Sequence, residues 1–235
     1  MLHSCVCSPS VRSTSGSYEK QSTLFHRDAF QDNPHTVRIL FIYTVFIVYA
    51  ELHCLTHYSF LRGASAPEEL IGRAASCGYH ALAITDECSL AGVVKAHVAA
   101  KELGLKLIVG SEFTLTEGIR LIALVPSREA YGELSGLISR ARRRSGKGQY
   151  RVHLRDVIFH LKRCLLVLLP DDTDKQAVHL QQLARRCKGR VWIGISRLLG
   201  NDEWRRFKHR YHIAQNLQVP MVACGEVQMH SAKRK

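Results

Sequence analysis

The sequence predicts an α/β fold built on a closed, mainly parallel sheet. Seven short apolar runs alternate with segments of helical periodicity from about residue 50 onward. Acidic or histidine side chains follow several of these runs, as they do at the carboxyl ends of barrel strands. The 235 residues, of which 46% are hydrophobic and 23% charged, suffice for one substantial core. A parallel α/β barrel satisfies all of these observations.

The first predicted elements are a strand and a helix. The run AELHCL, residues 50–55, has the apolar character of a strand and carries His53. The following segment opens a helix with Ser65 as its cap and Pro67 in its first turn. Glu68 lies three residues after Ser65, which is the spacing of a capping box.

A strand, a helix and a second strand follow between residues 80 and 113. The strand at residues 80–85 is a short apolar run that precedes Asp86. Ser89 is suited to cap the next helix, and Gly104 to end it in a left-handed conformation. The apolar face of this helix is predicted to contain Leu90, Val93, Val94 and Val98. The next strand, residues 106–109, is expected to end at a bend at Gly110, so that Glu112 lies beyond it.

The remaining elements continue the alternation to the end of the chain. Predicted strands are residues 119–125, 164–170, 191–195 and 220–224, and predicted helices are residues 127–143, 152–160, 173–188 and 202–217. The helix at 173–188 is expected to bury Val178, Leu180, Leu183 and Ala184.

Candidate metal ligands lie at or near the ends of four of these strands. They are His53, Asp86, Glu112, Glu226 and His230. Imidazole and carboxylate groups are the ligands of Zn²⁺, Mn²⁺ and Fe²⁺, and in a barrel they converge from distant parts of the chain. Taken one at a time, these acids are also what helix caps or solvated loops contain.

The net charge of +13 is unevenly spread, and its densest stretch begins in the last turn of a predicted helix. Its cations are Arg140, Arg142, Arg143, Arg144 and Lys147. A basic loop of this kind suits a polyanion such as nucleic acid, although cations are also favoured at any helix C-terminus. The stretch contains no interleaved aromatic residues of the kind that stack on bases.

Residues 1–48 differ from the rest of the chain. The first 36 residues are polar and show no period, so residues 1–48 are expected to form a disordered or non-native extension. The apolar run 39–50 is shorter than the roughly 18–20 residues that span a bilayer, and it is interpreted as a strand rather than a membrane anchor. The eight cysteines lack paired spacing apart from Cys5 and Cys7, which favours reduced thiols in a cytoplasmic protein.

Four blocks of the sequence together resemble a known family. They are ELHCLTHYSFLRGAS, GYHALAITDECSLAGVVKAH, LKLIVGSEF and VPMVACGEVQMH. They look like the PHP (polymerase and histidinol phosphatase) domain, and more narrowly like that of bacterial error-prone DNA polymerases of the C family. The resemblance covers residues 49–235 and implies a distorted (βα)7 barrel, truncated at its C-terminus, from a longer polymerase.

The metal motifs of that family carry over in part. His53 matches the first histidine of an H-x-H pair, but Leu55 stands at the second position. Asp86 is followed by Glu87 in place of histidine, and Glu226 and Gln228 stand where Asp-x-His is usual. Glu112 retains the acid of the third block. Leucine binds no metal and glutamine is a weak ligand, so the resemblance implies an eroded site.

The resemblance implies a domain that supports a polymerase in DNA replication, DNA repair and damage-induced translesion synthesis. Its partners would be the palm, fingers and thumb of that polymerase, DNA, and other translesion proteins, with no membrane. The palm carboxylates that hold Mg²⁺ for nucleotidyl transfer are expected outside this chain, so no polymerase catalytic residue is assigned. One alternative is a metal-dependent phosphoesterase or 3′–5′ exonuclease that uses Zn²⁺ or Mn²⁺ at the residual site. Another is a basic nucleic-acid-binding module.

Overall fold

A computed structural model describes residues 49–171, 176–196, 200 and 202–234 of the chain. Residues 1–48 lie outside the described part, so the expectation of a disordered or non-native extension stays a prediction. The strands are β1 (Ala50–Glu51), β2 (Ala81–Ile84), β3 (Lys106–Thr114), β4 (Arg120–Leu124), β5 (Leu165–Leu169), β6 (Val191–Ile195) and β7 (Met221–Ala223). The helices are α1 (Pro67–Ser76), α2 (Val93–Glu102), α3 (Arg128–Arg143), α4 (Leu154–His160), α5 (Ala177–Arg186) and α6 (Glu203–Leu217), followed by a short 3-10 helix, η2 (Ala232–Arg234).

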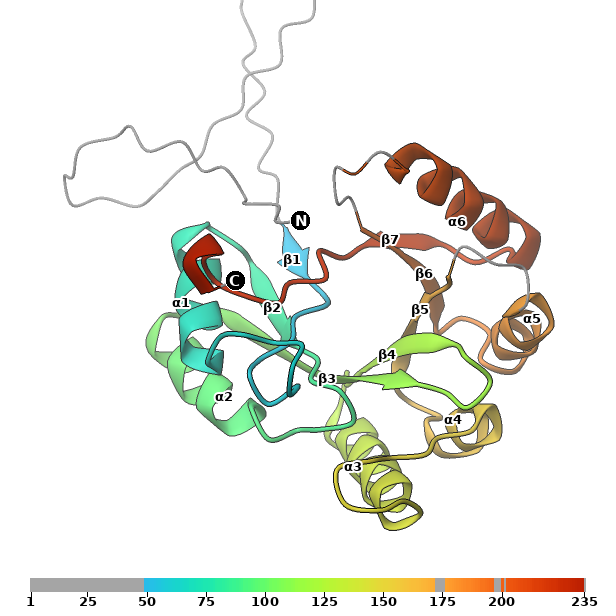
Figure 1. Cartoon of the computed structure of the whole chain (residues 1–235), viewed down its shortest axis with the longest axis horizontal. Helices are drawn as coiled ribbons and strands as arrows, with labels where there is room; N and C mark the ends of the chain where they lie inside the picture. The colour runs from blue at the N-terminus through green and yellow to red at the C-terminus, as the bar shows by residue number, and fades with distance from the viewer. Residues whose placement is uncertain (1–48, 172–175, 197–199, 201, 235) are drawn as a thin grey trace, which may run out of the picture.

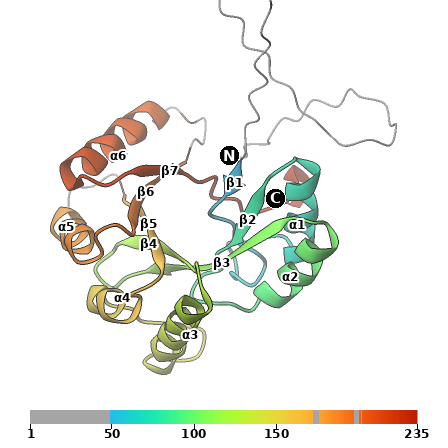
Figure 2. The ribbon, with the colours of Figure 1, turned by 180° about the vertical axis from the view of Figure 1, so that it is seen from behind.

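The seven strands form one sheet in the order of the chain, from β1 to β7. The sheet curves into a nearly closed barrel, and the helices lie around its outside (Figures 1 and 2). The predicted α/β barrel is therefore confirmed. In the described part of the chain, no helix has the length and apolar character needed to cross a membrane.

The mainly parallel sheet has one exception, β4. This strand pairs antiparallel with both β3 and β5, whereas the other neighbouring strands pair in parallel. The short turn at residues 115–119 joins β3 to β4 without a helix, and a connection of that length can join only antiparallel strands.

The predicted bend at Gly110 is wrong, because β3 continues without a break to Thr114. Val109 still pairs in parallel with Ile84, and from Gly110 onward the strand pairs antiparallel with β4. A Cβ at Gly110 would lie 2.8 Å from the carbonyl oxygen of Ala123, so glycine allows the two backbones to approach closely. Glu112 consequently lies inside a strand rather than beyond one.

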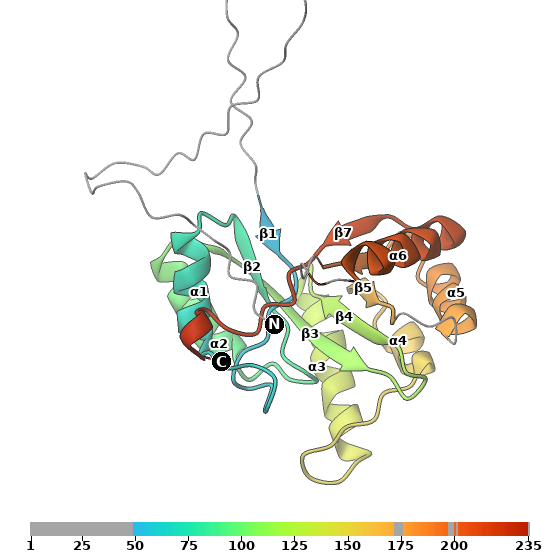
Figure 3. The ribbon, with the colours of Figure 1, turned by 45° about the horizontal axis from the view of Figure 1, so that its top comes forward.

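The barrel closes through the segments that follow β1 and β7. The amide of Leu55 donates to the carbonyl of Val227 at 2.8 Å, and the amide of Val227 donates to the carbonyl of His53 at 2.9 Å. The buried carboxylate of Glu51 adds a side-chain link by accepting from the amides of His53 at 2.8 Å and Gly225 at 2.7 Å. Figure 3 shows the chain after β7 passing β1 and ending beside α1.

The core has an inner layer inside the barrel and outer layers beneath the helices. Successive side chains of a strand point to opposite faces of the sheet, so each strand contributes alternately to the inner and the outer layer. Ile122 and Leu124 of β4 belong to the inner cluster, whereas Leu121 and Ala123 pack outward against the helices. On β3, Phe113 belongs to the outer cluster, so its neighbour Glu112 points to the barrel interior.

Helix α1 begins one residue later than its sequence pattern predicts. Its N-cap is Ala66, and the carboxylate of Glu69, rather than that of Glu68, returns to the Ala66 amide at 2.8 Å. Ser65 is fully buried, and its hydroxyl hydrogen-bonds His230. The prediction that Ser65 caps this helix is therefore wrong, and the serine instead bonds a residue near the other end of the chain.

The predicted apolar faces of α2 and α5 are partly wrong. Val94 and Val98 of α2 are 72% and 53% exposed, and the helix buries Ala96 and Ala100 instead. Val178 of α5 is 74% exposed, whereas Leu180, Leu183 and Ala184 are buried as expected. Helices on the rim of a small barrel bury a narrow stripe, and in α2 that stripe consists of alanines, which pack closely on the sheet.

Candidate functional site

The site centres on Glu112, whose side chain is fully buried. His53, also fully buried, lies with its Nε2 2.6 Å from Oε2 of Glu112. Arg62 donates to the same carboxylate, with Nη1 2.9 Å from Oε1 and Nη2 3.2 Å from Oε2. Arg120 adds a third partner, with Nε 3.2 Å from Oε1. One carboxylate thus has an imidazole and two guanidinium groups around it.

This arrangement decides the protonation of Glu112. Burial alone would raise its pKa, but the hydrogen bond from His53 and the charges of Arg62 and Arg120 outweigh burial and lower the pKa to about 2. The carboxylate is therefore ionised near neutral pH. Its charge is balanced by cations that belong to the chain.

Asp86 is held by a different set of partners. It is 1% exposed, and its Oδ1 accepts from the amide of Thr56 at 2.8 Å and the hydroxyl of Ser59 at 2.7 Å. Its Oδ2 accepts from the hydroxyl of Thr56 at 2.8 Å. Asp86 thereby fixes the turn after β1, in the manner of a carboxylate that caps a loop.

Glu87, which stands where the family usually has a histidine, extends the network outward. Its carboxylate accepts from Nη1 of Arg62 at 2.8 Å and from the hydroxyl of Tyr150 at 2.7 Å. Burial, aided by Glu87, raises the pKa of Tyr150 above its ordinary value, so this hydroxyl stays protonated and donates. Arg62 therefore bridges Glu87 and Glu112.

Glu226 joins the site through Arg120, whose Nη2 lies 2.7 Å from Oε1 of Glu226. Arg120 in this way links the acid of β3 to the segment after β7. Leu55 is fully buried and contributes no ligand atom. The backbone carbonyl of Gln228 accepts from the amide of Ala64 at 2.9 Å.

His230 has other partners than the Glu112 group. Its Nδ1 lies 2.8 Å from the hydroxyl of Ser65 and 3.6 Å from the carboxylate of Glu69. The backbone amide of His230 donates to the same Ser65 hydroxyl at 3.0 Å. These bonds fasten the end of the described chain to the start of α1.

The structure thus brings two of the five predicted ligands, His53 and Glu112, into direct contact, and connects Glu226 to them through Arg120. Within the described residues, no group of three or more His, Cys, Asp or Glu side chains is arranged to hold a metal. Sequence reasoning missed Arg62 and Arg120, and no spacing marks either of them. The one available signal was that Arg62 lies within the first block of the resemblance, ELHCLTHYSFLRGAS.

The predicted basic cluster is largely engaged in internal contacts. Arg142 donates to the backbone carbonyls of Glu87 and Cys88, and Arg144 pairs with Asp156 at 2.6 Å. Arg140 lies 2.5 Å from Nε2 of His160. Arg143 and Lys147 are exposed. Nucleic-acid contact by this cluster stays a prediction that rests mainly on those two.

Two further features, a pocket and the cysteines, involve none of the predicted site residues. A pocket of about 430 Å³ is lined by Glu117, His153, Leu154, Arg155, His179 and Gln182, none of which is a predicted site residue. Cys54, Cys88, Cys164, Cys187 and Cys224 are buried and carry free thiols.

Comparisons with known proteins agree with this fold. A family model described as the PHP domain matches residues 51–192. The chain is 54% identical over 188 residues to an error-prone DNA polymerase of Saccharophagus degradans and 47% identical over 189 residues to that of Teredinibacter turnerae. Each alignment covers 80% of this chain and 18% of the relative, so the chain spans less than a fifth of the length of these polymerases.

Solved structures also share the fold. A protein from Bifidobacterium adolescentis, assigned as a metal-dependent phosphoesterase, aligns with a TM-score of 0.56 and 17% identity, over 79% of this chain and 88% of its own. An amidohydrolase from Chromobacterium violaceum, with bound sulfate and no metal, aligns with a TM-score of 0.55 and 16% identity, over 77% and 87%. At such identity these structures support the fold alone. With the family model covering more than half of its residues, the chain belongs to the PHP domain family.

Proposed function

We propose that this chain acts as a non-catalytic PHP domain within an error-prone DNA polymerase that serves DNA replication, repair and translesion synthesis in the cytoplasm. The identity to error-prone polymerases supports the assignment to that enzyme class. The palm, fingers and thumb of the polymerase, its DNA and other translesion proteins are the proposed partners. In this proposal the site around Glu112 stabilises the barrel, and no reaction step takes place in it.

The environment of Glu112 carries the proposal. A metal ion needs carboxylate lone pairs that are free to coordinate it, and here both oxygens of Glu112 accept from His53, Arg62 or Arg120. Two guanidinium groups beside the carboxylate would also repel a divalent cation. The donor set therefore does not fit the Zn²⁺ or Mn²⁺ of a phosphoesterase.

The same contacts give each group a structural task. Arg62 joins the loop after β1 to β3 through Glu112 and to the segment after β2 through Glu87. Arg120 joins β4 to β3 and to the segment after β7. Asp86 fixes the turn at Thr56 and Ser59. Together these bonds hold one end of the barrel near the place where the segments after β1 and β7 meet.

The alternative is a metal-dependent phosphoesterase or 3′–5′ exonuclease. One observation favours it: Nδ1 of His53 is buried and has no hydrogen-bond partner, as expected of a nitrogen reserved for a ligand. Metal analysis separates the two functions. The full chain is dialysed against Mn²⁺ or Zn²⁺, and the bound metal is measured by mass spectrometry together with the thermal midpoint of unfolding.

The non-catalytic proposal expects less than one tenth of an equivalent of metal and an unchanged midpoint. Stoichiometric metal that is lost in the His53→Ala variant would refute it and support the phosphoesterase. His97→Ala is the matched control, because His97 lies on an exposed part of α2. A binding titration of Arg143→Ala and Lys147→Ala against duplex DNA tests the third function, the basic nucleic-acid-binding module.

A further inference from the structure

Helix α6 carries a row of aromatic side chains that the fold does not bury. Trp204, Phe207 and Tyr211 follow one another at helical spacing, and Trp204 and Tyr211 are 65% and 41% exposed. The rings of Trp204 and Phe207 are stacked with centroids 5.4 Å apart and planes 8° from parallel. Phe207 and Tyr211 are stacked at 6.5 Å and 19°. Trp204 and Tyr211 therefore face solvent, and Phe207 is partly exposed.

The packing of α6 does not require these rings. The helix rests on the barrel through buried Ala214 and the half-buried Ile213 and Leu217. Arg210 also reaches inward, where it donates to the carbonyl of Gly194 at 3.3 Å. Large apolar rings left on a surface in a contiguous row mark a place where something binds.

Cations accompany the row. Arg205, Arg206 and Lys208 lie on the exposed part of the helix, against one acid within it, Glu203. The Nζ of Lys208 lies 5.3 Å from the centre of the Trp204 ring, so positive charge and aromatic surface occupy the same place. The side chain of Arg205 is 71% exposed and lies 3.6 Å from Asp202.

Aromatic side chains interleaved with Lys and Arg suit a polyanionic ligand that exposes flat, unstacked bases. Single-stranded nucleic acid has both properties, because its bases stack on aromatic side chains while its phosphates attract Lys and Arg. Duplex DNA keeps its bases stacked on one another and offers these rings no free face. A helix that lies on a membrane buries a continuous apolar face in it, whereas α6 packs its aliphatic Ile213 and Leu217 against the barrel.

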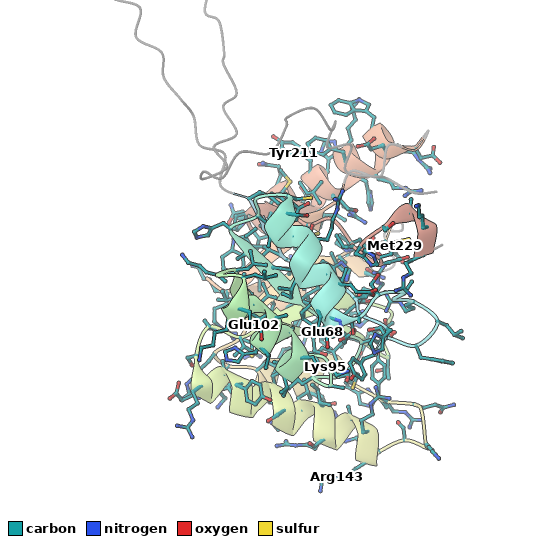
Figure 4. All side chains as sticks on the ribbon, turned by 90° about the vertical axis from the view of Figure 1, so that its left-hand side faces the viewer. Glu68, Lys95, Glu102, Arg143, Tyr211 and Met229 are labelled. Carbon is teal, nitrogen blue, oxygen red and sulfur yellow. The ribbon has the colours of Figure 1, made fainter. Side chains whose placement is uncertain are left out.

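We propose that the aromatic–basic face of α6, made of Trp204, Arg205, Phe207, Lys208 and Tyr211, binds single-stranded nucleic acid. Bases stack on Trp204 and Tyr211, and the phosphates lie near Arg205 and Lys208. This face is separate from the predicted basic cluster, since Figure 4 shows Tyr211 and Arg143 at opposite ends of the molecule. The proposal goes beyond the non-catalytic role and does not depend on it.

The test measures binding of the full chain to a 20-nucleotide oligothymidine at low salt. Trp192 and Trp204 are the two tryptophans of the chain, so a Trp192→Phe variant reports fluorescence from Trp204 alone. Stacking is expected to quench that emission as oligonucleotide is added. Fluorescence anisotropy of a labelled oligonucleotide gives the affinity independently.

Trp204→Ala and Tyr211→Ala are each expected to weaken binding about 5- to 150-fold, the range found for loss of one base–aromatic stack. Phe159→Ala is the matched control, because Phe159 is 66% exposed on α4 and lies outside the proposed face. Circular dichroism and the thermal midpoint confirm that each variant is folded.

Three results would overturn the proposal. They are binding by Trp204→Ala and Tyr211→Ala that equals the wild type, duplex DNA bound as tightly as the single strand, and no quenching of Trp204. Metal analysis is a separate measurement, so failure of this proposal and failure of the non-catalytic role are distinguishable.

Discussion

Replacement of Glu112 by glutamine is expected to destabilise the chain by about 3 kcal/mol at pH 7. The carboxylate has its pKa lowered from 4.5 to about 2, and each unit of difference between the folded and unfolded pKa contributes about 1.4 kcal/mol to the free energy of unfolding. Glutamine keeps the shape of the side chain but removes the charge that Arg62 and Arg120 need. A loss of this size is also typical when one partner of a buried ion pair is removed.

The loss should depend on pH. Because the folded pKa is the lower one, the stabilisation is complete above the unfolded value of 4.5 and disappears as pH falls through about 2. The difference between wild type and Glu112→Gln should therefore shrink to about 1 kcal/mol near pH 3. Urea titrations of both proteins at pH 7, 5 and 3, followed by circular dichroism, measure it.

Glu226→Gln is the matched control for this prediction. Glu226 shares Arg120 with Glu112, but its side chain is 22% exposed, and an ion pair at that exposure is worth less than about 1 kcal/mol. The reasoning is refuted if Glu112→Gln is as stable as wild type at pH 7. A loss that stays the same from pH 7 to pH 3 would equally show that the charge of Glu112 is not its cause.

Two further predictions concern the closure of the barrel. Gly225→Ala should lower the free energy of unfolding by about 1–3 kcal/mol, because its Cβ would overlap Oε2 of Glu51. Gly132→Ala on α3, with open space around it, should instead raise the value by up to about 1 kcal/mol, and urea denaturation compares the two variants. Ser65→Ala should release the segment around His230, seen as faster amide exchange after residue 227, while Ser135→Ala leaves exchange there unchanged. Equal exchange in both serine variants would contradict the role given to Ser65.

The order of strands and helices was predictable because each strand is a continuous apolar run and each helix has its own period. The antiparallel pairing of β4 was less accessible, since the turn at residues 115–119 had to be recognised as too short for a crossover. The exposure of Val94 and Val98 was not predictable from periodicity, because α2 presents alanines to the sheet. An apolar residue at helical spacing identifies the buried face of a helix only where the neighbouring sheet covers that face.

The site was predictable in its acids but not in their partners. Asp86 follows β2, as the end of its apolar run indicates, whereas Glu112 matches the acid of the third block of the resemblance but lies within β3. Arg62 and Arg120 belong to other elements, 50 and 8 residues away from Glu112 in the sequence, and converge on it only in the folded barrel. No spacing of residues along the sequence predicts that two arginines from different elements will contact one buried carboxylate.

The positive charge around Glu112 comes from Arg62 and Arg120, and this affects how the stability of the domain depends on ions in solution. A protein whose buried acid is neutralised by a bound ion gains stability according to the free concentration of that ion, and loses it to any chelator. Arg62 and Arg120 are covalently part of the chain, so their local concentration is fixed and no dissociation equilibrium is involved. The stability that these arginines confer on the barrel is therefore independent of the metal content of its surroundings.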